Sequence, residues 1–282
     1  MPRSDTLPHG LGTAVHRYLR VLDRVLPSRI VGFYLVGSVA LGAFRPRRSD
    51  IDFIAVVDEE LANSELRRLR LAQFRSGARS GAVALRHGLL AFPGTFNGVF
   101  VRAADLELPV SQIVPLASQA GHQFTVGRGF DVNPVVWKVF ADRGIAMRGP
   151  DAGELGLRPQ PELLQAWNLE NLDAYWRPWA EARQRRPGSK MRLLPRWSTA
   201  WGVLGAPRLH HTIATGEVAS KEAAGEYALD EFGPRWRPII EEGLGYWRGE
   251  PADPAFRDVR VRGGATAGFV LEVVGAARTL GP

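Results

Sequence analysis

The chain has 282 residues, of which 45% are hydrophobic and none is cysteine. This length predicts two domains, and the missing thiols exclude disulfides, thiolate zinc sites, iron–sulfur clusters and cysteine nucleophiles. The formal net charge is +7, and only three of the 36 basic residues are lysines. The arginines are scattered, and a solvated surface explains them as well as a polyanion does, so we do not expect nucleic acid as a partner.

No apolar run approaches the roughly 20 residues that span a bilayer. The first ten residues, MPRSDTLPHG, lack the apolar core of a signal peptide. We therefore expect a cytoplasmic protein without a membrane partner. Any metal in it must be held by oxygen or imidazole.

The first half of the chain predicts alternating helices and strands. Apolar residues recur at helical spacing over residues 11–26, and the turn PSR separates them from a buried strand, IVGFYLV, at 30–36. A second short, β-branched strand, IDFIAVV, follows at 51–57. An amphipathic helix is expected over 59–78 and a third strand around 99–101. This order predicts an α/β domain over residues 1–155.

The second half predicts helices only. After the Gly/Pro-rich stretch RGPDAGELGLRPQP, helical periods occupy residues 161–184, 194–216, 220–232 and 234–249. Ser220 is expected to cap the third of these helices. We therefore predict an α-helical bundle over residues 156–282.

The stretch GSVALGAFRPRRSDID lies between the first two predicted strands, at residues 37–52. Asp50 and Asp52 are two apart at the start of a strand, so they project from one face and repel unless a cation such as Mg²⁺ relieves them. Gly37 and Ser38 end a strand and open a helix, where free N–H groups favour a phosphate. Alone, Gly-Ser is a common turn and Asp-x-Asp is often solvated charge. Together they predict a nucleoside triphosphate held with Mg²⁺ for in-line displacement at phosphorus.

This stretch resembles the GS…DxD signature of the nucleotidyltransferase fold, whose enzymes transfer a nucleoside monophosphate and release pyrophosphate. The segments PRLHHTIATGEVASKEAAGEYAL, at 207–229, and GIAMRGP, at 144–150, are similar to two segments of the aminoglycoside (3'')(9) adenylyltransferase family. The resemblance covers nearly the whole chain. It implies a mixed sheet with flanking helices, a helical domain that caps a nucleotide cleft, ATP as co-substrate, Mg²⁺, and a role in antibiotic resistance. The acceptor would be a hydroxyl of a small molecule, with an aminoglycoside among the candidates, and we expect a monomer.

The resemblance also implies roles for seven residues: triphosphate contacts from Gly37, Ser38 and Ser49, Mg²⁺ ligation by Asp50 and Asp52, and ATP contacts from Arg208 and Lys221. Arg208 and Lys221 also have structural explanations that involve no ligand. Lys221 also fits a solvated residue in the first turn of a helix. Arg208 also fits a surface arginine whose stem covers the core.

The third catalytic position departs from the family pattern. The family's general base is a glutamate on the third strand, and the best register places Asn97 there. An amide cannot accept a proton, and general-base catalysis contributes about 10²- to 10⁴-fold. Two hypotheses follow: a weakened adenylyltransferase with Asn97 in the catalytic position, or a nucleotide-binding homologue with little or no activity.

Other side chains are weaker candidates. A bulge in the third strand would let Asp105 or Glu107 replace the base, and His122 is a further candidate, although each also fits an ordinary structural role. His210 and His211 are adjacent on one helix, so at most one faces any site. The candidates for contact with the acceptor are Trp197 and Trp201 as an aromatic platform or as bundle core, and Glu170 and Asp173 as negative charge. Modification of RNA or protein is a third hypothesis, but no RNA-binding module accompanies the fold.

Overall fold

The computed structural model describes residues 7–46, 48–86, 95–121, 123–184 and 195–280. Contacts between residues divide the chain into two units, Met1–Gln160 and Pro161–Pro282. The boundary expected from the sequence, after residue 155, lies five residues earlier. No helix in the described ranges is long and apolar enough to cross a bilayer.

Unit 1 contains a six-stranded sheet with the order β5-β4-β3-β2-β1-β6. Its strands are β1 (Ile30–Leu35), β2 (Ile51–Val57), β3 (Phe96–Arg102), β4 (Ala117–Ala120), β5 (Gln123–Val126) and β6 (Ile145–Arg148). β2 and β3 are parallel, and every other neighbouring pair is antiparallel. The expected mixed sheet is confirmed.

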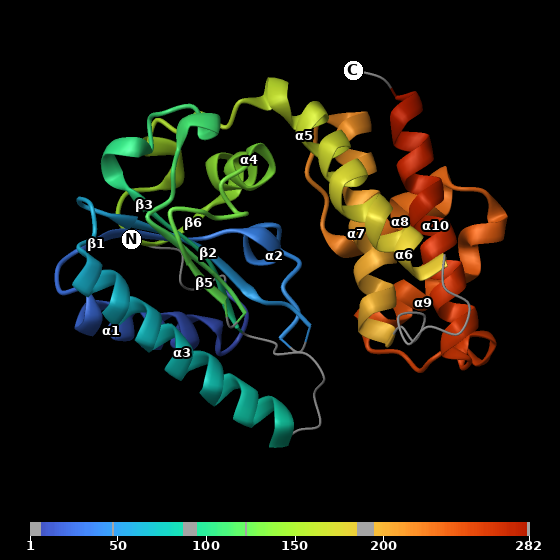
Figure 1. Ribbon diagram of the computed structural model, residues 1–282, viewed down its shortest axis with the longest axis horizontal. Coiled ribbons are helices and arrows are strands. Elements are labelled where there is room, and N and C mark those ends of the chain that lie inside the picture. Colours follow the sequence, from blue (N-terminus) through green and yellow to red (C-terminus); the bar gives the residue numbers. More distant parts are fainter. Residues whose placement is uncertain (1–6, 47, 87–94, 122, 185–194, 281–282) are drawn as a thin grey trace. The chain divides into compact units, whose positions relative to one another are not determined.

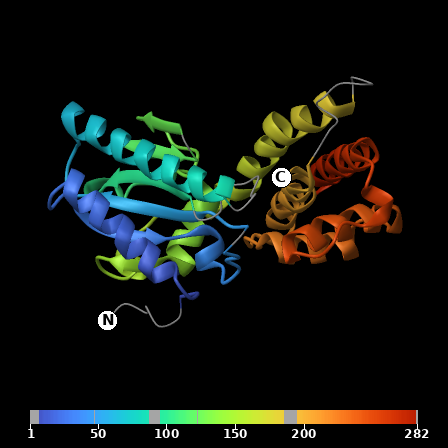
Figure 2. The same cartoon turned by 90° about the horizontal axis from the view of Figure 1, so that it is seen from below.

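Helices cover both faces of this sheet (Figure 1). They are α1 (Leu11–Val25), α2 (Gly37–Ala40), α3 (Asn63–Arg86) and α4 (Pro134–Arg143). α1 and α3 lie side by side on the face that carries Phe33, Phe53 and Phe100 (Figure 1 and Figure 2). α4 packs on the other face, against Ile54 and Val99. Because β2 is buried on both faces, its residues after Asp52 form an unbroken apolar run, Phe53 to Val57.

All regular elements in the described residues of unit 2 are helices, as predicted. Its helices are α5 (Leu164–Asn171), α6 (Arg177–Gln184), α7 (Arg196–Thr215), α8 (Lys221–Glu231), α9 (Arg237–Arg248) and α10 (Val259–Thr279). One π-helical segment, Leu172–Trp176, joins α5 to α6. α7 packs against α5, α8, α9 and α10. The hydroxyl of Ser220 accepts a hydrogen bond from the Ala223 amide at 3.1 Å, which confirms the expected cap of α8.

Candidate active site

The turn after β1 brings the backbone against the side chain of Asp52. Gly37 has a φ of +57°, and a β-carbon at this residue would lie 2.1 Å from Oδ2 of Asp52. The amide of Val36 also donates to the Asp52 carbonyl at 3.0 Å. The fold therefore requires glycine at residue 37 for two reasons, its left-handed backbone and its closeness to a carboxylate.

Replacing Gly37 by alanine is expected to destabilise unit 1 strongly. A left-handed alanine costs roughly 1–2 kcal/mol, and overpacking against Asp52 adds roughly 1–3 kcal/mol. Gly42→Ala is the matched control, because Gly42 has a φ of +68° with nothing within 4 Å of the added carbon. Thermal unfolding of both variants measures the difference. Equal losses in Tm would contradict the close approach to Asp52.

Acidic and amide side chains meet where β2 and β3 begin. Asp52 alternates with Ile51, so it lies on the same face as Ile54, the face that α4 covers. In the parallel register Asp52 is paired with Asn97. Asp50 is exposed and directly precedes β2. The structure thus brings together Asp50, Asp52 and Asn97.

Asn97 has a structural partner. Its side-chain oxygen accepts a hydrogen bond from the Gly121 amide at 2.7 Å, and Gly121 lies in the β4–β5 turn with a φ of +58°. The amide of Asn97 therefore holds the hairpin against β3. This contact gives a reason for asparagine at this residue that does not involve catalysis.

The two serines of the motif differ in their surroundings. The Ser38 hydroxyl oxygen is buried and has no hydrogen-bond partner in the described part of the chain, so a ligand oxygen would satisfy it. Ser49 is 3% exposed, and its hydroxyl accepts from the Arg45 amide at 3.1 Å. As placed, Ser49 shapes the loop before β2. α2 is a single turn, so individual N–H groups, and not a long helix dipole, would face an anion.

Asp131 was not singled out from the sequence. It lies half-buried in the loop between β5 and α4. Burial, with the negative charge of Asp52, raises the pKa of Asp131 to about 7. Asn133, two residues later, caps α4 by accepting from the Val136 amide at 3.0 Å. An aspartate two residues before a capping asparagine suggests only a turn, so no local pattern distinguishes Asp131 from an ordinary loop residue.

Asp131→Asn is expected to stabilise the protein at alkaline pH in the presence of EDTA. The folded-state pKa is raised from 3.8 to about 7, so the folded state binds more protons between these values. Stability is therefore lost as pH rises through this window. A difference of about three pKa units corresponds to roughly 4 kcal/mol, an upper bound that local relaxation reduces. The variant's Tm should exceed the wild-type Tm by several degrees at pH 8 and match it near pH 4. A difference that does not change with pH would contradict this.

The alternative bases lie away from Asp52. Asp105 is buried and receives two hydrogen bonds from Arg102, both 2.8 Å long. It follows the C-terminal end of β3, whereas Asp52 is paired near the N-terminal end. Glu107 lies further along the chain and is exposed. His122 falls outside the described residues.

In unit 2, Arg208 and Lys221 lie on helices α7 and α8, which pack together. Nε of Arg208 donates to the carbonyl of Ala219 at 2.9 Å. Nζ of Lys221 lies 5.3 Å from the ring centroid of Trp201 and 4.6 Å from that of Trp247. Arg208 thus supports the segment that leads into α8, and Lys221 lies against two aromatic faces.

The tryptophans considered for the acceptor lie at the surface of unit 2. Trp197 is 44% and Trp201 40% exposed, so neither is bundle core, although the Trp201 ring lies 5.7 Å from that of buried Trp176. Glu170 is exposed. Asp173 accepts hydrogen bonds from two arginines, Arg177 and Arg278.

The two adjacent histidines point to different partners. His210 is 1% exposed, with Nδ1 2.8 Å from the Tyr227 hydroxyl, and burial lowers the pKa of His210. Nδ1 of His211 lies 3.0 Å from the Glu217 carbonyl. Both contacts are within unit 2 and give these residues structural roles.

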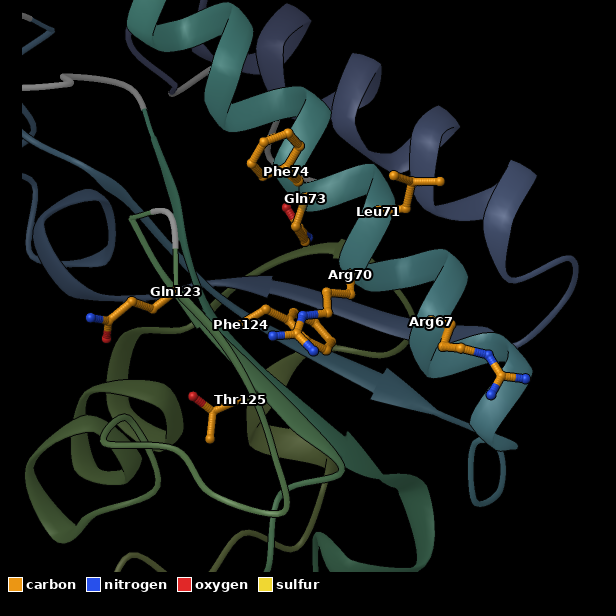
Figure 3. A pocket seen from close by; sticks show the side chains of 8 residues that line it. All are labelled: Arg67, Arg70, Leu71, Gln73, Phe74, Gln123, Phe124 and Thr125. Atoms are coloured by element: carbon orange, nitrogen blue, oxygen red, sulfur yellow. The ribbon is translucent and has the colours of Figure 1, made fainter.

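A groove lies between α3 and β5 in unit 1 (Figure 3). The residues that line it are Arg67, Arg70, Leu71, Gln73, Phe74, Gln123, Phe124 and Thr125. Phe124 packs with the core beneath α1 and α3, whereas Asp52 faces α4. The groove is therefore separate from the acidic site.

Two parts of the sequence match known families. Residues 17–83, which include Gly37 and Asp52, match the nucleotidyltransferase domain. Residues 187–262, which include Arg208 and Lys221, match the aminoglycoside adenylyltransferase C-terminal domain.

Full-length relatives agree with this assignment. The chain is 22% identical over 263 residues to an aminoglycoside (3'') (9) adenylyltransferase of Escherichia coli, a match that covers 86% of this chain and 87% of the relative. The fold of this chain is similar to the fold in the crystal structure of spectinomycin adenyltransferase AAD(9) from Enterococcus faecialis with ATP and spectinomycin. That likeness has a TM-score of 0.64 and 14% identity, and it covers 93% of this chain and 98% of the other. The chain thus combines a nucleotidyltransferase domain with a C-terminal domain similar to that of aminoglycoside adenylyltransferases, a combination that indicates an adenylyltransferase-type enzyme.

Proposed function

We propose that this protein transfers AMP from ATP to a hydroxyl of an aminoglycoside or of a spectinomycin-like antibiotic and releases pyrophosphate. The observation that carries the proposal is the contact of Gly37 with Asp52, which brings the first turn of α2 against a carboxylate. The two similar proteins support it, because one is named for aminoglycosides and the other was solved with ATP and spectinomycin.

The residues present fit Mg²⁺. Asp50 and Asp52 offer carboxylate oxygens on one face, and Mg²⁺ commonly binds one or two carboxylates and takes its other ligands from water and phosphate. When bound, Mg²⁺ neutralises charge that develops on the phosphate oxygens.

The chain's own groups would bind the nucleotide. The unsatisfied hydroxyl of Ser38 donates to a phosphate oxygen. Gly37 lets the backbone approach the triphosphate without a side chain between them. We propose that Arg208 and Lys221 contribute positive charge to ATP binding, as the family resemblance implies, and the aromatic faces around Lys221 limit its conformations.

Exposed aromatic rings would bind the acceptor. Trp197 and Trp201 offer apolar faces for sugar rings. Glu170 offers an exposed carboxylate to a cationic antibiotic. Asp173 is less suited, because Arg177 and Arg278 already bind its carboxylate.

Pyrophosphate release tests the proposed function. The purified protein is incubated with ATP, Mg²⁺ and each of a panel of aminoglycosides and spectinomycin, and parallel reactions contain EDTA. Release is expected only where ATP, Mg²⁺ and a suitable acceptor are all present. Absence of pyrophosphate release with every acceptor would overturn the hypothesis that the protein modifies an antibiotic.

A nucleotide-binding protein with little catalysis is the second candidate, and Asn97 favours it. This candidate predicts Mg²⁺-dependent ATP binding that Asp50→Ala abolishes, and a large rise in turnover in Asn97→Glu. A high wild-type rate that Asn97→Glu leaves unchanged would refute it.

A further inference from the structure

The groove between α3 and β5 has the size of a binding site. Its volume is about 590 Å³, within the range of roughly 300–1,000 Å³ that ligand pockets occupy. One wall is α3 and the other is β5 (Figure 3). Two large apolar side chains on the α3 wall, Phe74 and Leu71, are 69% and 50% exposed. Large apolar side chains that gather at an exposed groove indicate a surface that binds a partner.

The α3 wall also carries two arginines without an acidic partner. Arg67 and Arg70 are three residues apart, so they lie on the same side of the helix, and both are exposed. Neither makes a hydrogen bond or ion pair with the residues that the structure describes. No acidic side chain is among the described residues that line the groove. The groove therefore favours a ligand with carboxylate or other anionic groups.

The β5 wall is an edge of the sheet. β5 is the outermost strand and pairs on one side with β4. The Gly127 amide donates to the Leu116 carbonyl at 3.1 Å, in register with the β4–β5 pairs. Hydrogen-bonded and non-hydrogen-bonded residues alternate along an antiparallel pair. The backbone N–H and C=O groups of Phe124 and Val126 therefore point away from β4, towards the outer edge.

A buried network holds the two walls together. The Gln73 side chain, which lines the groove, donates to the hydroxyl of Tyr18. That hydroxyl donates to Oε1 of Gln119 on β4 at 3.1 Å, and the Gln119 side chain donates to the Phe96 carbonyl on β3. α3 is thus tied to the sheet beside β5. Because the groove is formed before a ligand binds, little binding energy is lost in ordering it.

We propose that this groove binds an extended, acidic segment of a partner protein as an added strand beside β5. Strand addition uses unpaired N–H and C=O groups such as those of Phe124 and Val126. Alternate side chains of the added strand would face α3, with carboxylates at Arg67 and Arg70 and an apolar side chain at Phe74. A small anion would leave the strand edge unpaired. A second copy of this chain, with its net charge of +7, matches the arginines less well than an acidic segment does.

Fluorescence anisotropy with a labelled probe peptide tests the inference. The probe is a short peptide of alternating glutamate and valine, blocked at both ends, and the comparison peptide carries lysine in place of glutamate. We expect the full chain to bind the acidic probe saturably and the lysine peptide at least about tenfold more weakly. Added salt should weaken binding of the acidic probe, because the arginines are exposed.

Variants of both walls locate the binding site. Arg67→Glu and Arg70→Glu should each raise the Kd of the acidic probe at least about tenfold, because a charged contact is replaced by repulsion. Val126→Pro removes one outward N–H group and should raise the Kd about fivefold. Arg68→Glu is the matched control, because Arg68 is exposed on the same helix but does not line the groove. Its Kd should stay within about twofold of wild type. Thermal unfolding checks that each variant is folded.

Several results would overturn the inference. They include no saturable binding of the acidic probe, or equal affinity for the lysine peptide. A loss of affinity in Arg68→Glu as large as that in Arg70→Glu would show attraction to overall positive charge alone. Unchanged binding in Val126→Pro would exclude strand addition. A dimeric wild type that Val126→Pro converts to a monomer would assign the edge to a second copy of this chain.

The inference is independent of the proposed function, because the groove is separate from the acidic site. Arg70→Glu should release pyrophosphate at the wild-type rate with the acceptor that the wild type uses best. A protein that modifies no acceptor can still bind the acidic probe, and an active enzyme can fail to bind it. The two proposals are therefore overturned by different measurements.

Discussion

Replacing Asp52 by asparagine is expected to lower kcat for AMP transfer by at least about 10³-fold, which corresponds to roughly 4 kcal/mol of transition-state stabilisation. The amide keeps the size of the carboxylate, so the contact with Gly37 is retained. It loses the negative charge that, with Asp50, matches a divalent cation. Titration of the apoprotein with Mg²⁺ and ATP should show weaker, less Mg²⁺-dependent binding.

The Asp52→Asn substitution should not lower the stability of the fold. Asp52 and Asp131 repel, so in EDTA at pH 8 the variant should unfold at the wild-type temperature or above it. Asp142→Asn, on the surface of α4, controls for the loss of one negative charge. Wild-type turnover in Asp52→Asn would contradict the assigned site.

The largest effect on stability is expected from Glu242→Ala in unit 2. The Glu242 side chain is 1% exposed and accepts from Nε of Arg196 at 2.7 Å. It also accepts from the Asp253 amide at 3.0 Å. Removing one partner of a buried ion pair costs roughly 3–5 kcal/mol. Calorimetry of the full chain should show the unfolding transition of unit 2 lowered by roughly 10 °C or more.

The neighbouring Glu241 provides a matched control. Its side chain is 55% exposed, and its nearest contact with Arg237 measures 3.5 Å. Exposed pairs of this kind contribute about 0–1 kcal/mol, so Glu241→Ala should shift the transition little. Similar shifts of the unfolding transition in the two variants would show that the buried ion pair contributes no more stability than the exposed one.

The core strands of unit 1 could be predicted because their local sequences are short, apolar and bounded by turns. β1 and β2 are short apolar runs bounded by turns, and the structure places them at Ile30–Leu35 and Ile51–Val57. The expected third strand is present and longer, at Phe96–Arg102. β4 and β5 were missed because ASQA and QFTV are short and mostly polar, and their pairing depends on neighbours in the sheet.

Helices α4 and α10 were also missed. The sequence of α10, Val259–Thr279, includes Gly263, Gly264, Gly268 and Gly275, which weaken a helix on intrinsic propensity. Packing against α6 and α7 overrides that preference. Tertiary contacts of this kind leave no local signal in the sequence.

The same distinction applies to the active site. Gly37, Ser38, Asp50 and Asp52 could be proposed as site residues because one short stretch of sequence carries them all. The raised pKa of Asp131 could not be predicted, since it depends on burial and on the charge of Asp52. The structural role of Asn97 likewise depends on the β4–β5 turn, which the sequence did not predict.

The mass of the acceptor after reaction tests the central claim most directly. Spectinomycin and each aminoglycoside are incubated with the wild-type protein, ATP and Mg²⁺, and the products are analysed by mass spectrometry. We expect at least one acceptor to gain the mass of one AMP group with equimolar pyrophosphate, and Asp52→Asn to leave that acceptor unmodified. Unmodified acceptors throughout, or the same adduct with Asp52→Asn, would contradict the account.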